Sequence, residues 1–195
     1  MDLKKNLQNA IEFHKNGDFY EAKNIYEEIL KLNPDLPEIN HNLGILLKSM
    51  DKLEEAERRF AKAISLKSDF VHAHYHMGNT KYKLKKFDES EYSYKKAISL
   101  NSKFIEAYIN LSRAQRELGR LNEAEENARI ALKLNPDLAD ANNQLSLILF
   151  DRGRLSDDLQ NKDFGKLNEA KTIILRAIDL NPNYALSYLN YGLIL

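Results

Sequence analysis

The chain has 195 residues, and its 29 Lys and Arg residues balance its 29 Asp and Glu residues, giving a formal net charge of zero. Because this balance gives no overall attraction for phosphate backbones or anionic lipid, we expect neither a nucleic acid nor a membrane as partner. Cysteine is absent, which excludes disulfide frameworks, thiolate nucleophiles and Cys-ligated zinc. The charged segment from Met1 to Gly17 lacks the apolar core of a signal peptide, and no apolar run has the length of a membrane span. We therefore expect a cytoplasmic protein.

The elements predicted along the chain are helices in pairs. Only four prolines and seven glycines are present, so strands joined by tight glycine turns have little support. A motif that precedes the second helix of each pair recurs every 34 residues, as Gly17–Ala22, Asp51–Ala56, Lys85–Ser90 and Gly119–Ala124. A fifth copy, Gly165–Ala170, follows 46 residues after the fourth, which places 12 additional residues near 154–165. This insertion is interpreted either as a neutral loop between two helices or as a partner-specific contact.

Small residues recur in two columns of this register. The first helices carry Ala10, Gly44, Gly78, Ser112, Ser146 and Gly192, and the second helices carry Ala22, Ala56, Ser90, Ala124 and Ala170. Small side chains there allow the two helices of a pair to approach closely, while large residues such as Tyr26, Phe60 and Tyr94 fill the remaining space. A third column is expected in the first turn of each second helix, where a carboxylate complements the helix dipole. Its members are Glu21, Glu55, Glu89, Glu123 and Glu169.

These residues and their spacing resemble the tetratricopeptide repeat, a pair of antiparallel helices with small residues at its eighth, twentieth and twenty-seventh positions. The resemblance implies an all-α, right-handed superhelical solenoid of antiparallel helix hairpins, formed as a single domain over 1–195. Five repeats, 3–36, 37–70, 71–104, 105–138 and 139–184, are followed by one extra helix over 185–195. The chain departs from the family pattern at the fourth position, which lacks Trp, and at Ala128 and Ile174, which replace an aromatic residue.

The last segment, Tyr184–Leu195, ends in mid-repeat on an apolar run. Repeat arrays usually finish with a helix whose outer face is polar, because each repeat buries its apolar face only against its neighbours. Three interpretations stay open: the final helix caps the core, the native protein continues beyond Leu195, or the chain self-associates through this C-terminal helix.

In proteins of this family the first helix of each repeat lines a concave groove, so the resemblance implies that six equivalent residues face a ligand. These residues are Gln8, Asn42, His76, Asn110, Gln144 and Asn190. All can form hydrogen bonds, and a side-chain amide offers both a donor and an acceptor to an extended peptide backbone. The ladder is similar to the asparagine ladder in the repeat arm of O-linked N-acetylglucosamine transferases, from which His76 and two glutamines depart. Because amides are common on helix surfaces, a solvated face is the alternative.

Other side chains fall at groove positions of the same helices. They are His41, His72, Tyr75, Asn79, Tyr82, Arg113 and Arg116, with Lys48, Lys83, Glu106 and Phe150. Aromatic residues interleaved with arginine fit a peptide or stacked bases, and the zero net charge favours the peptide. Tetratricopeptide proteins that grip a terminal carboxylate use a clamp of Lys, Asn and Arg side chains. Asn79 and Asn110 match two clamp positions, but Tyr75, Asp140 and Gln144 stand where its cations belong, so terminal-carboxylate capture is not expected.

Signatures of catalysis and of metal binding are weak. His72 and His76 share one helix face at a spacing that can chelate a metal, but no third ligand is evident, so we expect no metal site. The sequence has no HExxH, EF-hand or GxSxG motif, and Gly165–Lys166 lacks the other residues of a phosphate-binding loop. We therefore expect no cofactor and no enzymatic activity.

The sequence favours a protein-interaction scaffold that binds a peptide segment of a partner in the concave groove. The alternative is a substrate-recruiting N-terminal arm of a larger enzyme, such as a glycosyltransferase or sulfotransferase, whose catalytic domain lies beyond Leu195. Nucleic-acid binding is a third and weaker hypothesis.

Overall fold

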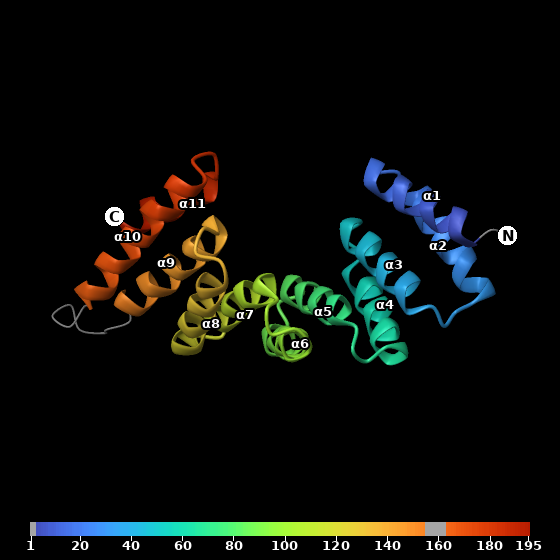
Figure 1. Cartoon of the computed structure of the whole chain (residues 1–195), viewed down its shortest axis with the longest axis horizontal. Helices are drawn as coiled ribbons and strands as arrows, with labels where there is room; N and C mark the ends of the chain where they lie inside the picture. Colours follow the sequence, from blue (N-terminus) through green and yellow to red (C-terminus); the bar gives the residue numbers. More distant parts are fainter. Residues whose placement is uncertain (1–2, 155–162) are drawn as a thin grey trace. The chain divides into compact units, whose positions relative to one another are not determined.

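The structure is a computed structural model that describes residues 3–154 and 163–195. Over these ranges it contains eleven α-helices and no strand, which confirms the all-helical repeat fold (Figure 1). Contacts divide the chain into two compact units, Met1–Leu100 and Asn101–Leu195, called unit 1 and unit 2 below. No helix among the described residues has the length and apolar character needed to cross a membrane.

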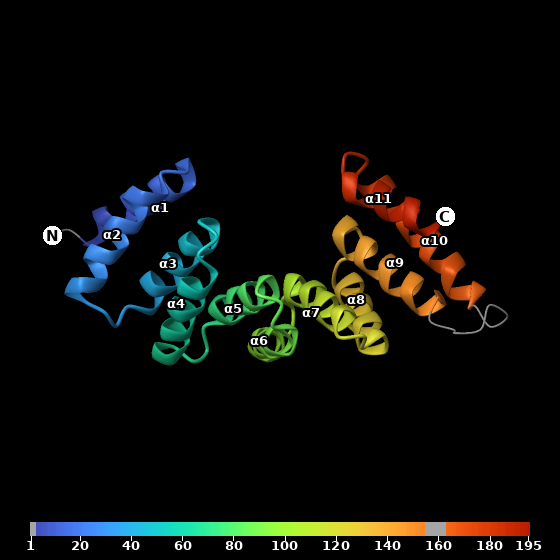
Figure 2. The same cartoon turned by 180° about the vertical axis from the view of Figure 1, so that it is seen from behind.

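Unit 1 consists of three helix hairpins. Its helices are α1 (Leu3–Asn16), α2 (Phe19–Leu32), α3 (Pro37–Ser49), α4 (Leu53–Leu66), α5 (Val71–Lys83) and α6 (Phe87–Leu100). A short turn joins the two helices of each hairpin, so they run antiparallel, as Figure 2 shows from behind. The second helices α2 and α4 also pack on the first helices of the next hairpins, α3 and α5, and the first helices α3 and α5 contact each other.

Unit 2 contains two hairpins and a further helix. Its helices are α7 (Ile105–Glu117), α8 (Leu121–Leu134), α9 (Ala139–Arg154), α10 (Phe164–Leu180) and α11 (Ala185–Ile194). With 16 and 17 residues, α9 and α10 are each three residues longer than their counterparts α7 and α8, which have 13 and 14. Six additional helical residues therefore adjoin or overlap the predicted insertion, and residues 155–162 lie outside the described ranges.

The small-residue column explains how closely the helices of a hairpin approach. A Cβ atom added at Gly44 would lie 2.7 Å from the Phe60 ring, and one added at Gly78 would lie 2.6 Å from the Tyr94 ring. Since real Cβ atoms do not approach so closely, a side chain at either position would displace the ring, which agrees with the small residues expected there. At Gly192 the predicted close approach is absent, because no atom lies within 4 Å of an added Cβ.

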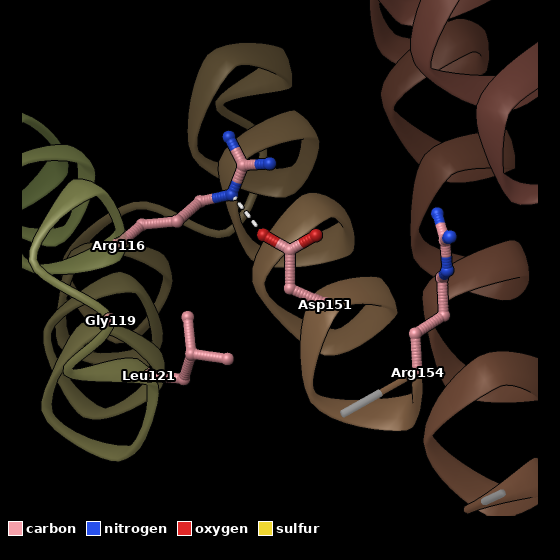
Figure 3. Close-up of a pocket in the computed structure, with 5 residues that line it drawn as sticks. All are labelled: Arg116, Gly119, Leu121, Asp151 and Arg154. Carbon is pink, nitrogen blue, oxygen red and sulfur yellow. Dashed lines mark hydrogen bonds and ion pairs between the residues drawn. The ribbon is translucent and has the colours of Figure 1, made fainter. Parts of the chain in front are cut away.

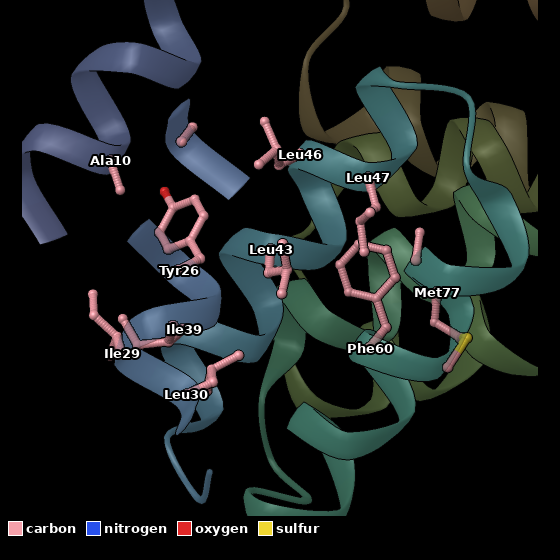
Figure 4. Close-up of a cluster of buried hydrophobic side chains, with 12 residues drawn as sticks. Ala10, Tyr26, Ile29, Leu30, Ile39, Leu43, Leu46, Leu47, Phe60 and Met77 are labelled. Carbon is pink, nitrogen blue, oxygen red and sulfur yellow. The ribbon is translucent and has the colours of Figure 1, made fainter. Parts of the chain in front are cut away.

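The core of unit 1 continues from one hairpin to the next. Figure 4 shows Tyr26 beside Ala10 of the first hairpin, and Phe60 beside Leu47 and Met77 further along. The Tyr26 and Phe60 side chains are at most 1% exposed, and burial raises the pKa of Tyr26 to about 12. Each hairpin thus depends on its neighbours for the burial of its large side chains.

The turns inside four hairpins contain one residue in the left-handed region at equivalent positions. Gly17, Asp51, Lys85 and Gly119 have φ values of 88°, 58°, 59° and 72°. Glycine adopts this conformation at little cost, whereas a Cβ atom strains it. We expect Lys85→Gly to raise the free energy of unfolding, measured by urea denaturation, by about 0.5–1 kcal/mol. Asp51→Gly should raise the free energy of unfolding by less, since Asp tolerates this region better than Lys. A loss of stability in Lys85→Gly would contradict the backbone strain at this position.

A charge network joins three helices of unit 2. Glu125 of α8 pairs with Arg129 of the same helix at 2.9 Å, with Lys166 of α10 at 3.2 Å and with Arg152 of α9. Glu169 was expected in the first turn of its helix, but α10 begins earlier, at Phe164, and Glu169 instead pairs with Arg129 at 2.6 Å. The network therefore anchors the lengthened helices α9 and α10 to α8.

This charge network predicts that the stability of the folded chain falls in acid. Burial alone would raise the pKa of Glu125, but hydrogen bonds from Arg129, Lys166 and Arg152 outweigh burial and hold that pKa below its ordinary value of 4.5. The resulting stabilisation is complete above pH 4.5 and is lost as the pH falls through the lower folded-state pKa. We expect Glu125→Gln to lower the free energy of unfolding at neutral pH by about 1–3 kcal/mol and to flatten its decline in acid, as measured by urea denaturation. An unchanged acid profile would exclude this role.

Candidate functional site

Three predicted groove residues of unit 1, His41, Tyr75 and His76, lie together where the first helices α3 and α5 contact each other. The His41 ring on α3 lies 5.2 Å from the His76 ring on α5 and 4.7 Å from the ring of Phe70. Phe60 stacks on His76 at 5.9 Å, and Tyr75 lies 5.2 Å from His76. We call this group of rings the α3–α5 seam.

The two seam histidines are neutral and incompletely hydrogen-bonded. Burial lowers the pKa of His76 to about 3, assisted by the positive charge of Lys48, and burial also lowers the pKa of His41. His41 Nδ1 lies 3.3 Å from Asn42 Oδ1, to which it can donate a hydrogen bond. His41 Nε2 and His76 Nδ1 are buried and have no hydrogen-bond partner. The seam therefore holds unused hydrogen-bonding capacity.

The low pKa of His76 predicts a loss of stability in mild acid. The unfolded chain binds a proton below about pH 6.5 that folded His76 accepts only near pH 3, so the stabilisation is complete above pH 6.5 and is lost as the pH falls toward 3. We expect the free energy of unfolding to fall by about 1–2 kcal/mol between roughly pH 7 and pH 5, and His76→Gln to reduce this fall. Urea denaturation at the two pH values measures both, and an equal fall in the variant would contradict the assignment.

A cavity of about 350 Å³ adjoins Asn42 in unit 1. It is lined by Ile11, His14, Lys15, Tyr26, Asn42 and Ile45 of α1, α2 and α3. Asn42 is half-buried, and Gln8, the preceding member of the ladder, is exposed on α1. The sequence predicted Asn42 as a groove residue but none of the other lining residues. In the sequence, apolar residues such as Ile11 and Ile45 look the same whether they line a cavity or belong to the core.

The remaining predicted residues of α5 have mixed surroundings. Asn79 Oδ1 accepts a hydrogen bond of 2.7 Å from the Tyr94 hydroxyl, so this amide is partly engaged in holding α6. The Tyr82 ring packs 5.3 Å from Phe87, while His72 is exposed. Among the described residues, no group of three or more His, Cys, Asp or Glu side chains is arranged to hold a metal ion.

In unit 2 the predicted arginines are paired with carboxylates of the next first helix. Arg113 of α7 donates a hydrogen bond of 2.8 Å to Asn110 and forms an ion pair with Asp140 of α9. Arg116 pairs with Asp151 of α9 at 2.6 Å (Figure 3). The acids Asp140 and Asp151 therefore neutralise the cations that were expected to meet a ligand.

A cavity of about 400 Å³ lies beside the Arg116–Asp151 pair. It is lined by Arg116, Gly119, Leu121, Asp151 and Arg154, as Figure 3 shows. The Arg154 guanidinium lies 5.1 Å from the centre of the Phe150 ring, which places a second cation and an aromatic face next to this cavity.

The last two members of the ladder are more enclosed than a solvated face would be. Gln144 is 5% exposed and Asn190 is 4% exposed. Asn190 Nδ2 donates a hydrogen bond of 2.9 Å to Asn143 Oδ1 and so joins α11 to α9. Gln144 Nε2 is buried without a hydrogen-bond partner, which leaves a donor available.

Comparison with known families identifies the repeat. Family models described as tetratricopeptide repeat match residues 71–104, 13–77 and 93–126, which together cover more than half of the chain. The chain belongs to the tetratricopeptide repeat family. The match at 71–104 has the same bounds as the third repeat expected from the sequence. Tetratricopeptide repeat proteins act as protein-interaction scaffolds and are typically not enzymes.

Solved tetratricopeptide repeat structures share this fold over nearly the whole chain. MamA from Desulfovibrio magneticus RS-1 is 18% identical with a TM-score of 0.78, covering 94% of this chain and 98% of that one. YrrB, described as a TPR protein with an unusual peptide-binding site, is 19% identical with a TM-score of 0.75, covering 96% and 90%. TTC0263, a thermophilic TPR protein from Thermus thermophilus, is 16% identical with a TM-score of 0.72, covering 98% of both chains. No curated protein matches the sequence.

Proposed function

We propose that this tetratricopeptide repeat protein is an interaction scaffold that binds an extended segment of a partner protein along its first helices. The observation that carries the proposal is the position of the unpaired polar atoms. Among the described residues, four buried side-chain atoms have no hydrogen-bond partner: His41 Nε2, His76 Nδ1, Gln144 Nε2 and Ser187 Oγ. All four lie on first helices, and the three nitrogens are at predicted groove positions.

A buried polar atom without a partner costs free energy, so a ligand that supplies the partner gains that energy on binding. With Nδ1 donating to Asn42, His41 Nε2 carries a lone pair that fits a peptide N–H group. The Nε2 group of Gln144 is a donor that fits a peptide carbonyl. Both requirements are met by a peptide main chain, which alternates donors and acceptors whatever its sequence.

Half-buried amides extend the same capacity in each unit. Asn42 lines a cavity of about 350 Å³ in unit 1. Asn110 on α7 is half-buried and accepts a hydrogen bond from Arg113 through its side-chain oxygen. YrrB, a protein of the same fold, is described as having a peptide-binding site, which supports a peptide ligand for this chain as well.

The test begins with a peptide selected against the full chain from a display library of random dodecapeptides. We expect Asn42→Ala in unit 1 to weaken binding of that peptide by about fivefold, since one hydrogen bond is lost. The matched control is Asn24→Ala, which removes an exposed amide from the second helix α2 and should leave affinity unchanged. Fluorescence anisotropy measures both, and equal affinities for the two variants would overturn the proposal.

A further inference from the structure

Unit 1 contains lysines with and without a carboxylate partner. Seven of them form ion pairs with carboxylates: Lys23, Lys52, Lys62, Lys67, Lys81, Lys86 and Lys95. Neither Lys48 of α3 nor Lys83 of α5 forms an ion pair with a carboxylate of the described residues; several exposed lysines, such as Lys31, lack one as well, but Lys48 is half-buried. Both stand at groove positions of first helices, whereas most of the pairs lie on second helices and turns.

Lys48 lies beside the α3–α5 seam in a positive environment. It is half-buried, and burial followed by the charge of Lys83 lowers its pKa. The charge of Lys48 in turn contributes to the low pKa of His76, together with His41 and His72. The charge of Glu38 acts on His41, but the Glu38 carboxylate pairs with Lys67 at 3.5 Å. No carboxylate of the described residues forms an ion pair with Lys48 or Lys83.

In unit 2, carboxylates of the chain itself neutralise the cations of a first helix. Arg113 and Arg116 of α7 each meet an aspartate of α9, Asp140 and Asp151. A half-buried cation without such a partner loses hydration and gains no Coulomb energy in return. A carboxylate supplied by a ligand would restore that balance at the half-buried Lys48, and the exposed side chain of Lys83 is accessible to a second carboxylate.

We propose that the α3–α5 seam binds an acidic segment of the partner protein, with Asp or Glu side chains placed against Lys48 and Lys83. This inference rests on the proposed function and adds the chemical class of the ligand to it. The unpaired seam atoms at His41 and His76 would contact the main chain of the segment, and the two lysines would select its side chains.

An acidic peptide fits this site better than a nucleic acid does. Affinity for nucleic acid depends on the number of phosphates that the protein neutralises. The seam offers only two lysines, its buried histidines His41 and His76 have lowered pKa values, and the chain has zero net charge. Two lysines are enough to pair with a few carboxylates of a peptide, whereas a nucleic acid would need a longer row of basic residues.

The library selection against the full chain also tests the inference. We expect Asp and Glu to be enriched among peptides selected by the wild-type chain, and this enrichment to be lost with Lys48→Gln/Lys83→Gln. The matched control is Lys31→Gln/Lys96→Gln, which removes the same charge from exposed positions of α2 and α6 and should retain the enrichment. A selected acidic peptide should bind the seam variant about tenfold more weakly than the control variant, and this difference should shrink at high salt.

Each result separates the inference from the proposed function. Selection of peptides without acidic enrichment overturns the inference but leaves the peptide-binding proposal standing. Recovery of no peptide overturns both. Equal enrichment with the two lysine variants, after urea denaturation has shown both to be folded, also overturns the inference. A single-stranded RNA oligonucleotide that binds as tightly as the acidic peptide and competes with it would identify a phosphate site instead and contradict the assignment.

Discussion

Phe60→Ala is expected to lower the free energy of unfolding by about 4 kcal/mol, the largest effect of any substitution considered for this chain. The Phe60 side chain is 0% exposed, and it packs against Gly44, whose added Cβ would lie 2.7 Å from the ring. Its ring also stacks on His76 at 5.9 Å. Truncation therefore leaves a cavity between α3, α4 and α5 and removes the support of the seam.

Urea denaturation followed by circular dichroism measures this loss. The matched control is Tyr20→Ala, which truncates an aromatic side chain of a second helix that is 73% exposed, and it should change stability by less than about 0.5 kcal/mol. A loss below about 1 kcal/mol in Phe60→Ala would show that the Phe60 ring is not enclosed as the structure describes.

Gly78→Leu is expected to cost about 3 kcal/mol through overpacking. An added Cβ at Gly78 would lie 2.6 Å from the ring of Tyr94, and Tyr94 is held in place because its hydroxyl donates to Asn79 at 2.7 Å. The ring is 1% exposed, so it cannot move aside into solvent. The hairpin of α5 and α6 must then open, which exposes its core.

The control for this substitution is another helical glycine in the same register. No atom lies within 4 Å of a Cβ added at Gly192 of α11, so Gly192→Ala should be neutral or stabilise the chain by up to about 1 kcal/mol through helix propensity. The melting temperatures of the two variants should therefore move in opposite directions or differ widely. A neutral Gly78→Leu would contradict the helix register.

The repeat pattern predicts local structure well, because each column of the repeat reflects contacts within a hairpin. Gly44 and Gly78 meet Phe60 and Tyr94, each 16 residues further along the chain, as the small-residue column indicates. The repeat pattern does not predict the length of α10. Its start at Phe164, with Asp163 accepting a hydrogen bond from the Lys166 backbone N–H, depends on residues of the insertion that have no counterpart in other repeats.

The site was predicted only in part, because the charge of a groove residue depends on whether a side chain of another repeat forms an ion pair with it. The sequence places Arg113, Arg116, Lys48 and Lys83 at similar groove positions. Aspartates of the next first helix neutralise the two arginines, but no described carboxylate pairs with the two lysines. A single sequence gives no direct signal for this difference, since it arises from side chains that meet across 27 and 35 residues.

Hydrogen–deuterium exchange of the full chain with a selected peptide tests the proposed binding surface most directly. We expect the peptide to slow amide exchange in the first helices α3 (Pro37–Ser49) and α5 (Val71–Lys83), and to leave the exposed faces of α4 and α6 unchanged. Protection confined to the second helices α4 and α6 would contradict the account.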